Sequence, residues 1–325
     1  MIDKKDLRIV YMGTPQFAVE PLKALLTEGY NIAAVVTTPD KPAGRGQKLS
    51  QSAVKQFAIS NGLKVLQPQN LKDPSFINEL TSIKPHIMVV VAFRMLPEVV
   101  WAIPTLGTFN LHASLLPNYR GAAPINWAII NGESKTGLTT FLIDHQIDTG
   151  NILLRQEVDI NPNETAGDLH DRLMPIGGEL VVKTIDLLAQ GNVKPISQEE
   201  LVEQGNEPKM APKLFKETIR IDWSINVKSV FNFVRGLSPY PAAWSTLEDS
   251  NGNEQSVKIF KAKIIETNES HPAVGEIKTD GRTYIYVKCG KGSLAIEELQ
   301  LAGKKNLPVK DFLLGFRGIE TYKFV

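Results

Sequence analysis

The first half of the chain alternates short runs of β-branched and other apolar residues with segments of helical periodicity. This alternation is typical of βαβ units, in which helices join parallel strands and cover the sheet that they form. The run Ile87 to Ala92 is apolar on both faces, as a central strand of such a sheet requires. We therefore expect an α/β domain with a mostly parallel sheet.

One long helix and a polar connection follow this alternating region. Thr165 to Gln190 is mostly helical in pattern, with Thr165 as the expected N-cap, but Pro175 and the pair Gly177-Gly178 should kink or split the helix. Residues 192–212 are polar, contain three prolines and show no apolar period that would require burial. We interpret them as a linker.

The last third of the chain has a different pattern. A helical face between the expected cap Ser224 and the turn at Gly236 is followed by short strand-like runs separated by Gly, Asn or Asp. Such runs are typical of a small β-barrel. The 325 residues are thus expected to form two domains, 1–191 and 213–325, on either side of the linker 192–212.

Charge is distributed unevenly along the chain, although the net charge is only +1. Residues 1–207 carry 18 Lys and Arg against 22 Asp and Glu, whereas residues 208–325 carry 18 against 13. A polyanion would therefore be attracted more to the second part. Ordinary surface variation explains so small an excess equally well.

Several classes of function find no support in the sequence. The opening residues MIDKKDLRIV lack the long apolar region of a signal peptide, and no apolar run approaches the roughly 18 residues needed to cross a bilayer. We therefore expect a cytoplasmic protein without membrane contact. The five histidines form no metal-ligand pattern, and the single cysteine, Cys289, is interpreted as a small core residue. No metal is expected. Gly13 follows the first strand, but the other glycines of a dinucleotide site are missing.

The stretch from Phe109 to Ile129 carries the strongest chemical signal. Asn110 and His112 lie two residues apart in a predicted strand and should project from the same face. An amide and a protonated imidazole can both donate hydrogen bonds to an oxygen that becomes negative. A nearby carboxylate would stabilise the imidazolium and could accept a proton. Asp144 and Asp148 are both candidates, and their spacing does not decide between them.

Three segments of the sequence resemble the formyltransferases that use 10-formyltetrahydrofolate. They are Phe109 to Pro117, Tyr119 to Ile125 and Asp148-Thr149-Gly150. The resemblance selects Asp148 over Asp144, and it implies a catalytic trio of Asn110, His112 and Asp148. It also implies that one apolar turn contacts the folate, through Ser114, Leu115, Leu116 and Pro117.

Further segments are similar to the branch of this family that formylates methionyl-tRNA. They are Gly13-Thr14-Pro15, Pro39 to Gly46, Ile221-Asp222-Trp223 and Ala302 to Lys305, and the likeness covers nearly the full length. It implies a Rossmann-like catalytic domain followed by an OB-type β-barrel that binds tRNA. The expected activity is transfer of a formyl group from 10-formyltetrahydrofolate to the α-amino group of methionyl initiator tRNA, by a monomer.

Basic residues in two places are the expected contacts to the tRNA. Lys41, Arg45 and Lys48 lie in a loop with glycines and a proline, which suits a mobile contact to phosphates or to an acceptor stem. Lys304 and Lys305 are candidates in the second domain. Both sets could instead be solvated surface cations.

The sequence departs from the family pattern in two places. Residues Ala92 to Pro97 form a segment one residue shorter than usual, with Arg94 where glycine is expected, so the folate-side loop should differ. Asn151 replaces the usual acidic residue after Asp-Thr-Gly. Arg120 is expected either to anchor the loop after the folate turn or to form a structural salt bridge.

Two other functions stay open. A related formyltransferase could act on a small amine, such as a purine precursor or an amino sugar. A protein from another class, which binds RNA without catalysis on an inactive scaffold, would also carry a basic second domain.

Overall fold

The structure is a computed structural model, and it describes residues 3–43, 48–202, 207–265 and 273–325. Contacts divide the chain into two compact units, each assembled from three segments. Unit 1 comprises Met1–Gly121, Thr136–Val158 and His170–Met210. Unit 2 comprises Ala122–Lys135, Asp159–Leu169 and Ala211–Val325.

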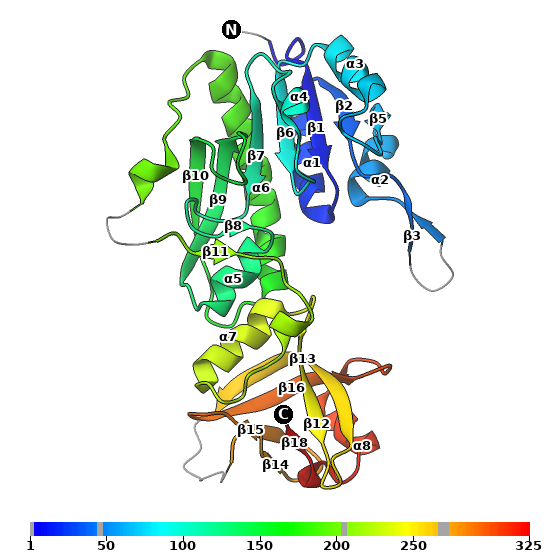
Figure 1. Cartoon of the computed structure of the whole chain (residues 1–325), viewed down its shortest axis with the longest axis vertical. Helices are drawn as coiled ribbons and strands as arrows, with labels where there is room; N and C mark the ends of the chain where they lie inside the picture. The colour runs from blue at the N-terminus through cyan, green and yellow to red at the C-terminus, as the bar shows by residue number, and fades with distance from the viewer. Residues whose placement is uncertain (1–2, 44–47, 203–206, 266–272) are drawn as a thin grey trace. The chain divides into compact units, whose positions relative to one another are not determined.

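Unit 1 is built around a seven-stranded sheet with the order β10-β9-β7-β6-β1-β2-β5. Its strands run side by side in Figure 1 and are β1 (Ile9–Gly13), β2 (Ile32–Val36), β5 (Val65–Leu66), β6 (Ile87–Val91), β7 (Thr108–His112), β9 (Lys135–Leu142) and β10 (Ile152–Asp159). The neighbouring strands β5 and β2, β2 and β1, β1 and β6, and β6 and β7 are parallel, whereas β9 pairs antiparallel with β7. The expected α/β class with a mostly parallel sheet is confirmed.

Helices cover both faces of this sheet. Helices α3 (Pro74–Ile83) and α4 (Glu98–Trp101) share an apolar cluster with Met12 and Val90 on one face. On the other face lie α1 (Val19–Thr27) and α6 (Ala166–Gln190), and the Tyr11 hydroxyl donates to the Ala18 carbonyl just before α1. The shorter elements are η1 (Gln16–Ala18), β3 (Lys41–Ala43), β4 (Lys48–Ser50), α2 (Ala53–Ser60), β8 (Arg120–Gly121) and η2 (Gln198–Leu201).

Helix α6 is one continuous helix of 25 residues with Pro175 inside it, so the expected split is wrong, whereas the alternative of a kink stays a prediction. Its expected N-cap is confirmed, because Thr165 Oγ1 accepts from the Asp168 amide at 3.1 Å. The two glycines have a packing role instead. A Cβ on Gly177 would lie 2.9 Å from Leu111 Cδ2, and one on Gly178 would lie 3.1 Å from Ala24 Cβ. Glycine lets α6 lie close to β7 and α1.

Unit 2 contains an antiparallel, barrel-like sheet with the order β14-β15-β16-β13-β12-β18, and β17 pairs with β16. The strands are β12 (Ala243–Glu248), β13 (Glu254–Ile265), β14 (Ile277–Thr279), β15 (Ile285–Lys288), β16 (Ser293–Leu301), β17 (Leu307–Pro308) and β18 (Lys323–Phe324). A backbone bridge between Glu276, just before β14, and Lys323 in β18 joins the two edges of the sheet, so the sheet is nearly closed. The expected small barrel is confirmed.

Helix α7 (Val227–Leu237) packs on this barrel through Val230, Val234 and Leu237. Its N-cap is Asn226, whose side chain accepts from the Ser229 amide at 3.0 Å, and not the expected Ser224. The Ser224 hydroxyl donates to Asp222 instead. The remaining elements are α5 (Pro124–Ile130), β11 (Met210–Ala211), η3 (Glu217–Ile219), α8 (Val309–Gly315) and η4 (Ile319–Thr321).

The segment read as a linker belongs to unit 1 as far as Met210 and is partly buried there. Ile196 and Ile152 exchange backbone hydrogen bonds of 2.8 and 2.9 Å, and Leu201 packs on the cluster of Leu116, Phe141 and Ile152. The polar composition of residues 192–212 gave no sign of this packing. The boundaries proposed at 191 and 213 stay a prediction.

Two further expectations can be compared with the structure. Cys289 is fully buried, which confirms it as a small core residue, and burial raises the pKa of its thiol to about 12. Within the described ranges, no helix combines the length and the apolar character that a membrane crossing needs.

The close contact of α6 with β7 predicts that Gly177→Val lowers the stability of the protein. The new side chain would press on buried Leu111, which should cost about 1 to 3 kcal/mol of unfolding free energy. Gly315→Val is the matched control, because no atom lies within 4 Å of a Cβ at Gly315. Thermal unfolding followed by circular dichroism measures both. Equal unfolding midpoints for the two variants would contradict this packing role.

Candidate active site

Strand β7 brings two of the predicted site residues to the carboxyl end of the parallel sheet. Asn110 is half-buried and His112 is 6% exposed, and both project from the same face of the strand. The side-chain amide of Asn110 makes no hydrogen bond to any residue that the structure describes. Since ligands of open α/β sheets bind beyond the carboxyl ends of the strands, this amide is available where a ligand is expected.

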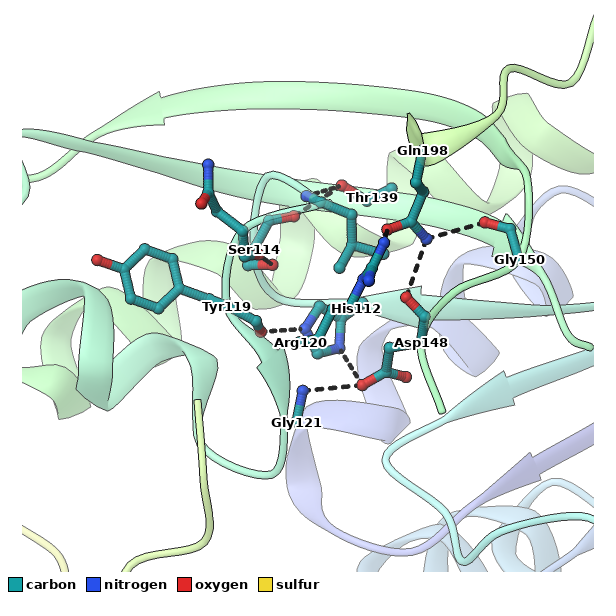
Figure 2. A network of polar contacts seen from close by, with 11 residues as sticks. His112, Ser114, Tyr119, Arg120, Gly121, Thr139, Asp148, Gly150 and Gln198 are labelled. Atoms are coloured by element: carbon teal, nitrogen blue, oxygen red, sulfur yellow. Dashed lines mark hydrogen bonds and ion pairs between the residues drawn. The ribbon is translucent and has the colours of Figure 1, made fainter. Parts of the chain in front are cut away.

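One ring nitrogen of His112 makes a hydrogen bond, and the other lies at ion-pair distance from a carboxylate (Figure 2). Nε2 lies 2.8 Å from the Tyr119 carbonyl oxygen. Because a carbonyl oxygen only accepts, Nε2 carries a proton and donates it. Nδ1 lies 3.9 Å from Asp148 Oδ2, which is within the range of an ion pair but too long for a hydrogen bond. Nδ1 therefore keeps its hydrogen-bonding capacity for another group.

The carboxylate of Asp148 has a fixed position beside this imidazole. Its Oδ2 accepts from the Gly121 amide at 3.0 Å, and the residue has a left-handed backbone, with φ of 56°. Asp144, the other candidate, accepts from Gln146 N and Thr149 Oγ1, both at 2.9 Å, and so is engaged within its own loop. The geometry favours Asp148, in agreement with the resemblance. Its role in catalysis stays a proposal.

Gln198 connects the two loops that carry these groups, and sequence reasoning missed it. The side-chain oxygen accepts from Arg120 Nε at 2.9 Å and Nη2 at 2.6 Å. The side-chain nitrogen donates to the carbonyl oxygens of Asp148 and Gly150, both at 2.9 Å (Figure 2). The residue is 2% exposed although it lies in the polar segment 192–212, where no apolar period indicates burial.

The same contacts settle the role of Arg120. Its partner is a neutral amide, and it forms no ion pair with a carboxylate in the part of the chain that the structure describes. Of the two expectations, anchoring of the loop is therefore confirmed and the salt bridge is not.

The predicted folate turn is internally bonded. Ser114 Oγ donates to the Asn118 carbonyl at 2.6 Å, and Thr139 Oγ1 donates to the Ser114 carbonyl and accepts from the Leu116 amide. Ser114 and Leu116 are fully buried and Pro117 is buried, whereas Leu115 is half-buried. The buried side chains shape the turn. Contact of this turn with folate stays a prediction.

The loop after β6, which we expect to be one residue shorter than in the family, is held by Arg94. Arg94 donates to the carbonyl oxygens of Pro68 and of Gln69, the latter at 2.9 Å. Ala92 has a left-handed backbone, with φ of 46°. The guanidinium is thus engaged by backbone next to β5, and removal from water lowers its pKa.

The basic loop is anchored at its base, whereas its tip lies outside the described residues. Asp40 accepts from Lys55 Nζ at 2.6 Å and from Gln67 at 2.9 Å, and these hydrogen bonds lower the pKa of Asp40, with Lys55 the larger cause. Lys41 is exposed in β3. Arg45 and the side chain of Lys48 lie outside the described residues.

Lys304 and Lys305 are exposed in the turn that follows β16. Among the described residues, no group of three or more His, Cys, Asp or Glu side chains is arranged to hold a metal ion.

A held imidazole with a carboxylate and a free amide beside it, at the carboxyl end of a parallel sheet, is an arrangement suited to transfer of an acyl-type group. Family comparisons agree with this class. Residues 7–185 match the model of the formyl transferases, and residues 213–317 match the model of the formyl transferase C-terminal domain. The chain therefore belongs to the formyl transferase family.

The similarity to a curated relative extends over nearly the whole chain. It is 53% identical over 320 residues to the methionyl-tRNA formyltransferase of Parabacteroides distasonis, a match that covers 98% of each protein. Among solved structures, an N-formyltransferase from Helicobacter canadensis in complex with folinic acid and dTDP-3-aminofucose matches with a TM-score of 0.62 at 21% identity, over 89% of this chain and 97% of that one.

HypX from Aquifex aeolicus in complex with tetrahydrofolic acid shares the fold as well. The TM-score is 0.61 at 19% identity, and the match covers 94% of this chain and 46% of the HypX chain. This chain thus spans about half the length of HypX. At 19 and 21% identity, both solved structures show a shared fold and no more.

The side-chain hydrogen bonds of Gln198 predict that Gln198→Leu lowers kcat about 10- to 100-fold with little change in KM. The variant leaves Arg120 and the carbonyls of Asp148 and Gly150 without a partner, so the Asp148 turn can shift by a fraction of an ångström or more. Gln156→Leu is the matched control, because Gln156 is exposed. Steady-state kinetics on folded samples provide the measurement. A Gln198 variant with unchanged kcat would contradict a positioning role.

Proposed function

We propose that the protein transfers the formyl group of 10-formyltetrahydrofolate to the α-amino group of methionyl initiator tRNA, giving N-formylmethionyl-tRNA for translation initiation. The observation that carries this proposal is the 53% identity to a methionyl-tRNA formyltransferase over 98% of both chains. Such a match includes the C-terminal barrel, which a catalytic domain alone does not need. The expected cytoplasmic location and monomeric state remain predictions.

The site geometry supports a mechanism in which Asn110 and His112 stabilise negative charge. Attack of the substrate amine on the formyl carbon makes a tetrahedral centre, and its oxygen becomes an oxyanion. The free amide of Asn110 and the Nδ1 proton of the imidazolium can both donate to this oxygen. The Tyr119 carbonyl holds the ring by Nε2, so Nδ1 need not reorient during the reaction.

Asp148 is assigned two roles. Its negative charge, 3.9 Å from Nδ1, stabilises the positive imidazolium. Directly or through a water molecule, its carboxylate also takes the proton that the attacking nitrogen must lose. The oxyanion then re-forms the carbonyl as the bond between the carbon and the folate nitrogen breaks, and that nitrogen receives the proton that Asp148 had taken, directly or through water. No covalent intermediate with the enzyme is required.

Binding of the two substrates is assigned to the predicted segments. The turn Ser114 to Pro117 would contact the folate. The loop containing Lys41, Arg45 and Lys48 would contact phosphates of the tRNA acceptor end, and the anchor of Asp40 on Lys55 would hold the base of this loop in place. Lys304 and Lys305 would contact the tRNA from the barrel.

A small-amine formyltransferase is the nearest alternative. The Helicobacter canadensis N-formyltransferase, solved in complex with dTDP-3-aminofucose, has the same fold, but at 21% identity the likeness shows the fold alone. A non-enzymatic RNA-binding protein would have no use for a carboxylate placed beside the imidazole at the end of β7. Neither alternative is favoured by an observation of its own.

The proposed roles predict that Asp148→Asn lowers kcat about 100-fold or more, because the uncharged amide neither stabilises the imidazolium nor accepts the proton. Asp144→Asn is the matched control. Its amide oxygen can still accept from Gln146 and Thr149, so kcat should stay within about tenfold of the parent value. Single-turnover rates measure the difference. The assignment of Asp148 fails if both variants lose activity equally.

Substrate choice is tested with the full chain, because removal of residues 208–325 would strip α7 from α5. Asn126 Nδ2 donates to the Gly236 carbonyl at 2.8 Å, so α5 belongs to the folded structure of unit 2. With 10-formyltetrahydrofolate as donor, we expect formylation of methionyl initiator tRNA and none of free methionine. Formylation of an amino sugar nucleotide or a purine precursor at a comparable kcat/KM would favour the alternative.

A further inference from the structure

The carbonyl that orients the imidazole of His112 belongs to a residue with an uncommon backbone conformation. Tyr119 has a φ of 63°, in the left-handed region that disfavours residues with a side chain, and it is 5% exposed. Its carbonyl oxygen lies 2.8 Å from His112 Nε2 (Figure 2). A conformation of this kind persists only where the surrounding contacts hold it. The orientation of the imidazole therefore depends on the contacts that hold Tyr119.

The residue before Tyr119 is fixed to the apolar turn by its main chain. The Asn118 amide donates to the Leu115 carbonyl at 3.1 Å, and the Asn118 carbonyl accepts from Ser114 Oγ at 2.6 Å. Neither hydrogen bond uses the side chain of Asn118. These contacts fix where the segment leading to Tyr119 begins, but they involve no atom of Tyr119 itself.

The contact to Tyr119 comes from Lys209, in the polar segment 192–212. The Tyr119 amide donates to the Lys209 carbonyl at 2.5 Å, and the Lys209 amide donates to Asn118 Oδ1 at 3.0 Å. One residue of the polar segment is thus bonded to two successive residues of the loop after β7. Two bonds at neighbouring positions restrict the rotation of the loop as well as its distance, which a single bond does not.

The side-chain bond of Asn118 contributes little to the stability of the fold. Asn118 is exposed, so water could accept from the Lys209 amide if the Asn118 side chain were absent. The net contribution of such a solvent-exposed hydrogen bond is small. Its consequence is geometric, because it fixes the direction in which the backbone enters the left-handed residue Tyr119.

We propose that Asn118 is a positioning residue for the reaction: its side chain, together with the main chain of Lys209, fixes the Tyr119 carbonyl that holds His112. This inference rests on the proposed function, in which Nδ1 of the same ring donates to the oxyanion. It requires no contact of Asn118 with either substrate.

The tautomer of His112 links this geometry to the chemistry. While Nε2 donates to the Tyr119 carbonyl, the neutral ring carries its proton on Nε2, and a second proton can only go to Nδ1. Asp148 Oδ2, 3.9 Å from Nδ1, favours a proton on that side of the ring. If the Tyr119 carbonyl moves away, the neutral ring should shift toward the Nδ1–H tautomer and turn, so that Nδ1 loses its fixed direction.

The polar segment 192–212 would then supply one positioning contact to each partner of the ion pair. Gln198 donates to the carbonyl oxygen of Asp148, and Lys209 bonds to the two residues that orient His112. The two contacts act on different groups, so their loss should have separable effects. Only the Asn118 contact should alter the His112 tautomer through Nε2.

The test uses the full chain and three variants. Asn118→Leu keeps the size of the side chain and removes the acceptor, whereas Asn118→Asp keeps an oxygen that can accept from the Lys209 amide. Asn61→Leu is the matched control, because Asn61 is also exposed and donates through its side chain to the Phe57 carbonyl at 2.8 Å, at the end of α2. The measurements are kcat and KM for methionyl-tRNA formylation, and the 15N chemical shifts of the neutral His112 ring, which report which nitrogen carries the proton.

We expect Asn118→Leu to lower kcat about 5- to 50-fold, with both KM values within about threefold of the parent. The neutral ring of His112 should change from the Nε2–H tautomer to a mixture of tautomers. Asn118→Asp should restore kcat to within about threefold of the parent, together with the Nε2–H tautomer. Asn61→Leu should change neither quantity.

The outcomes separate this inference from the proposed function. An Asn118→Leu variant with the parent tautomer would overturn the inference whether or not kcat falls, because its effect would then not pass through Tyr119. A kcat in Asn118→Asp as low as in Asn118→Leu would overturn it as well, since the acceptor is kept. If the parent protein transfers no formyl group to methionyl-tRNA, the proposed function fails, and the tautomers of the variants still decide the inference.

Discussion

The hydrogen bond from the Gly121 amide to Asp148 Oδ2 is the contact on which the candidate site depends. It joins the loop after β7 to the turn after β9, at 3.0 Å, although 27 residues separate the two partners. The same loop after β7 supplies the Tyr119 carbonyl that orients His112. One carboxylate oxygen therefore fixes the distance between the acid and the imidazole while it leaves Nδ1 without a hydrogen bond to any residue that the structure describes.

The first segment of unit 1 ends at Gly121, inside the motif that carries the family resemblance. The residues that orient the imidazole lie in unit 1, whereas Ala122–Lys135 and Asp159–Leu169 pack within unit 2. There Arg235, only 7% exposed, donates to the Asn232 side chain and the Glu164 carbonyl, both at 2.9 Å. Buried charge of this kind needs several partners, so these segments and α7 depend on one another. A motif continuous in sequence thus supports two folded units.

Much of the fold and the polar pair of the site could be predicted, because the signals are local. Asn110 and His112 lie in strand β7 as their pattern predicts, and alternation alone places them on one face. The sequence could not show that α6 is continuous. Gly177 serves close packing against Leu111, a residue 66 positions away, and this contact exists only in the folded chain. Gln198 could not be found either, because its partners Arg120, Asp148 and Gly150 are brought to it only by the folded chain.

The choice of glutamine at position 198 follows from the partners that surround it. Arg120 requires an acceptor, and the carbonyls of Asp148 and Gly150 require a donor. A side-chain amide supplies both at once, whereas a carboxylate only accepts and an ammonium only donates. A buried glutamate would pair with Arg120, but it would face two carbonyl oxygens and add a second negative charge near Asp148. The neutral amide thus positions the turn that carries Asp148, whose carboxylate faces the imidazole.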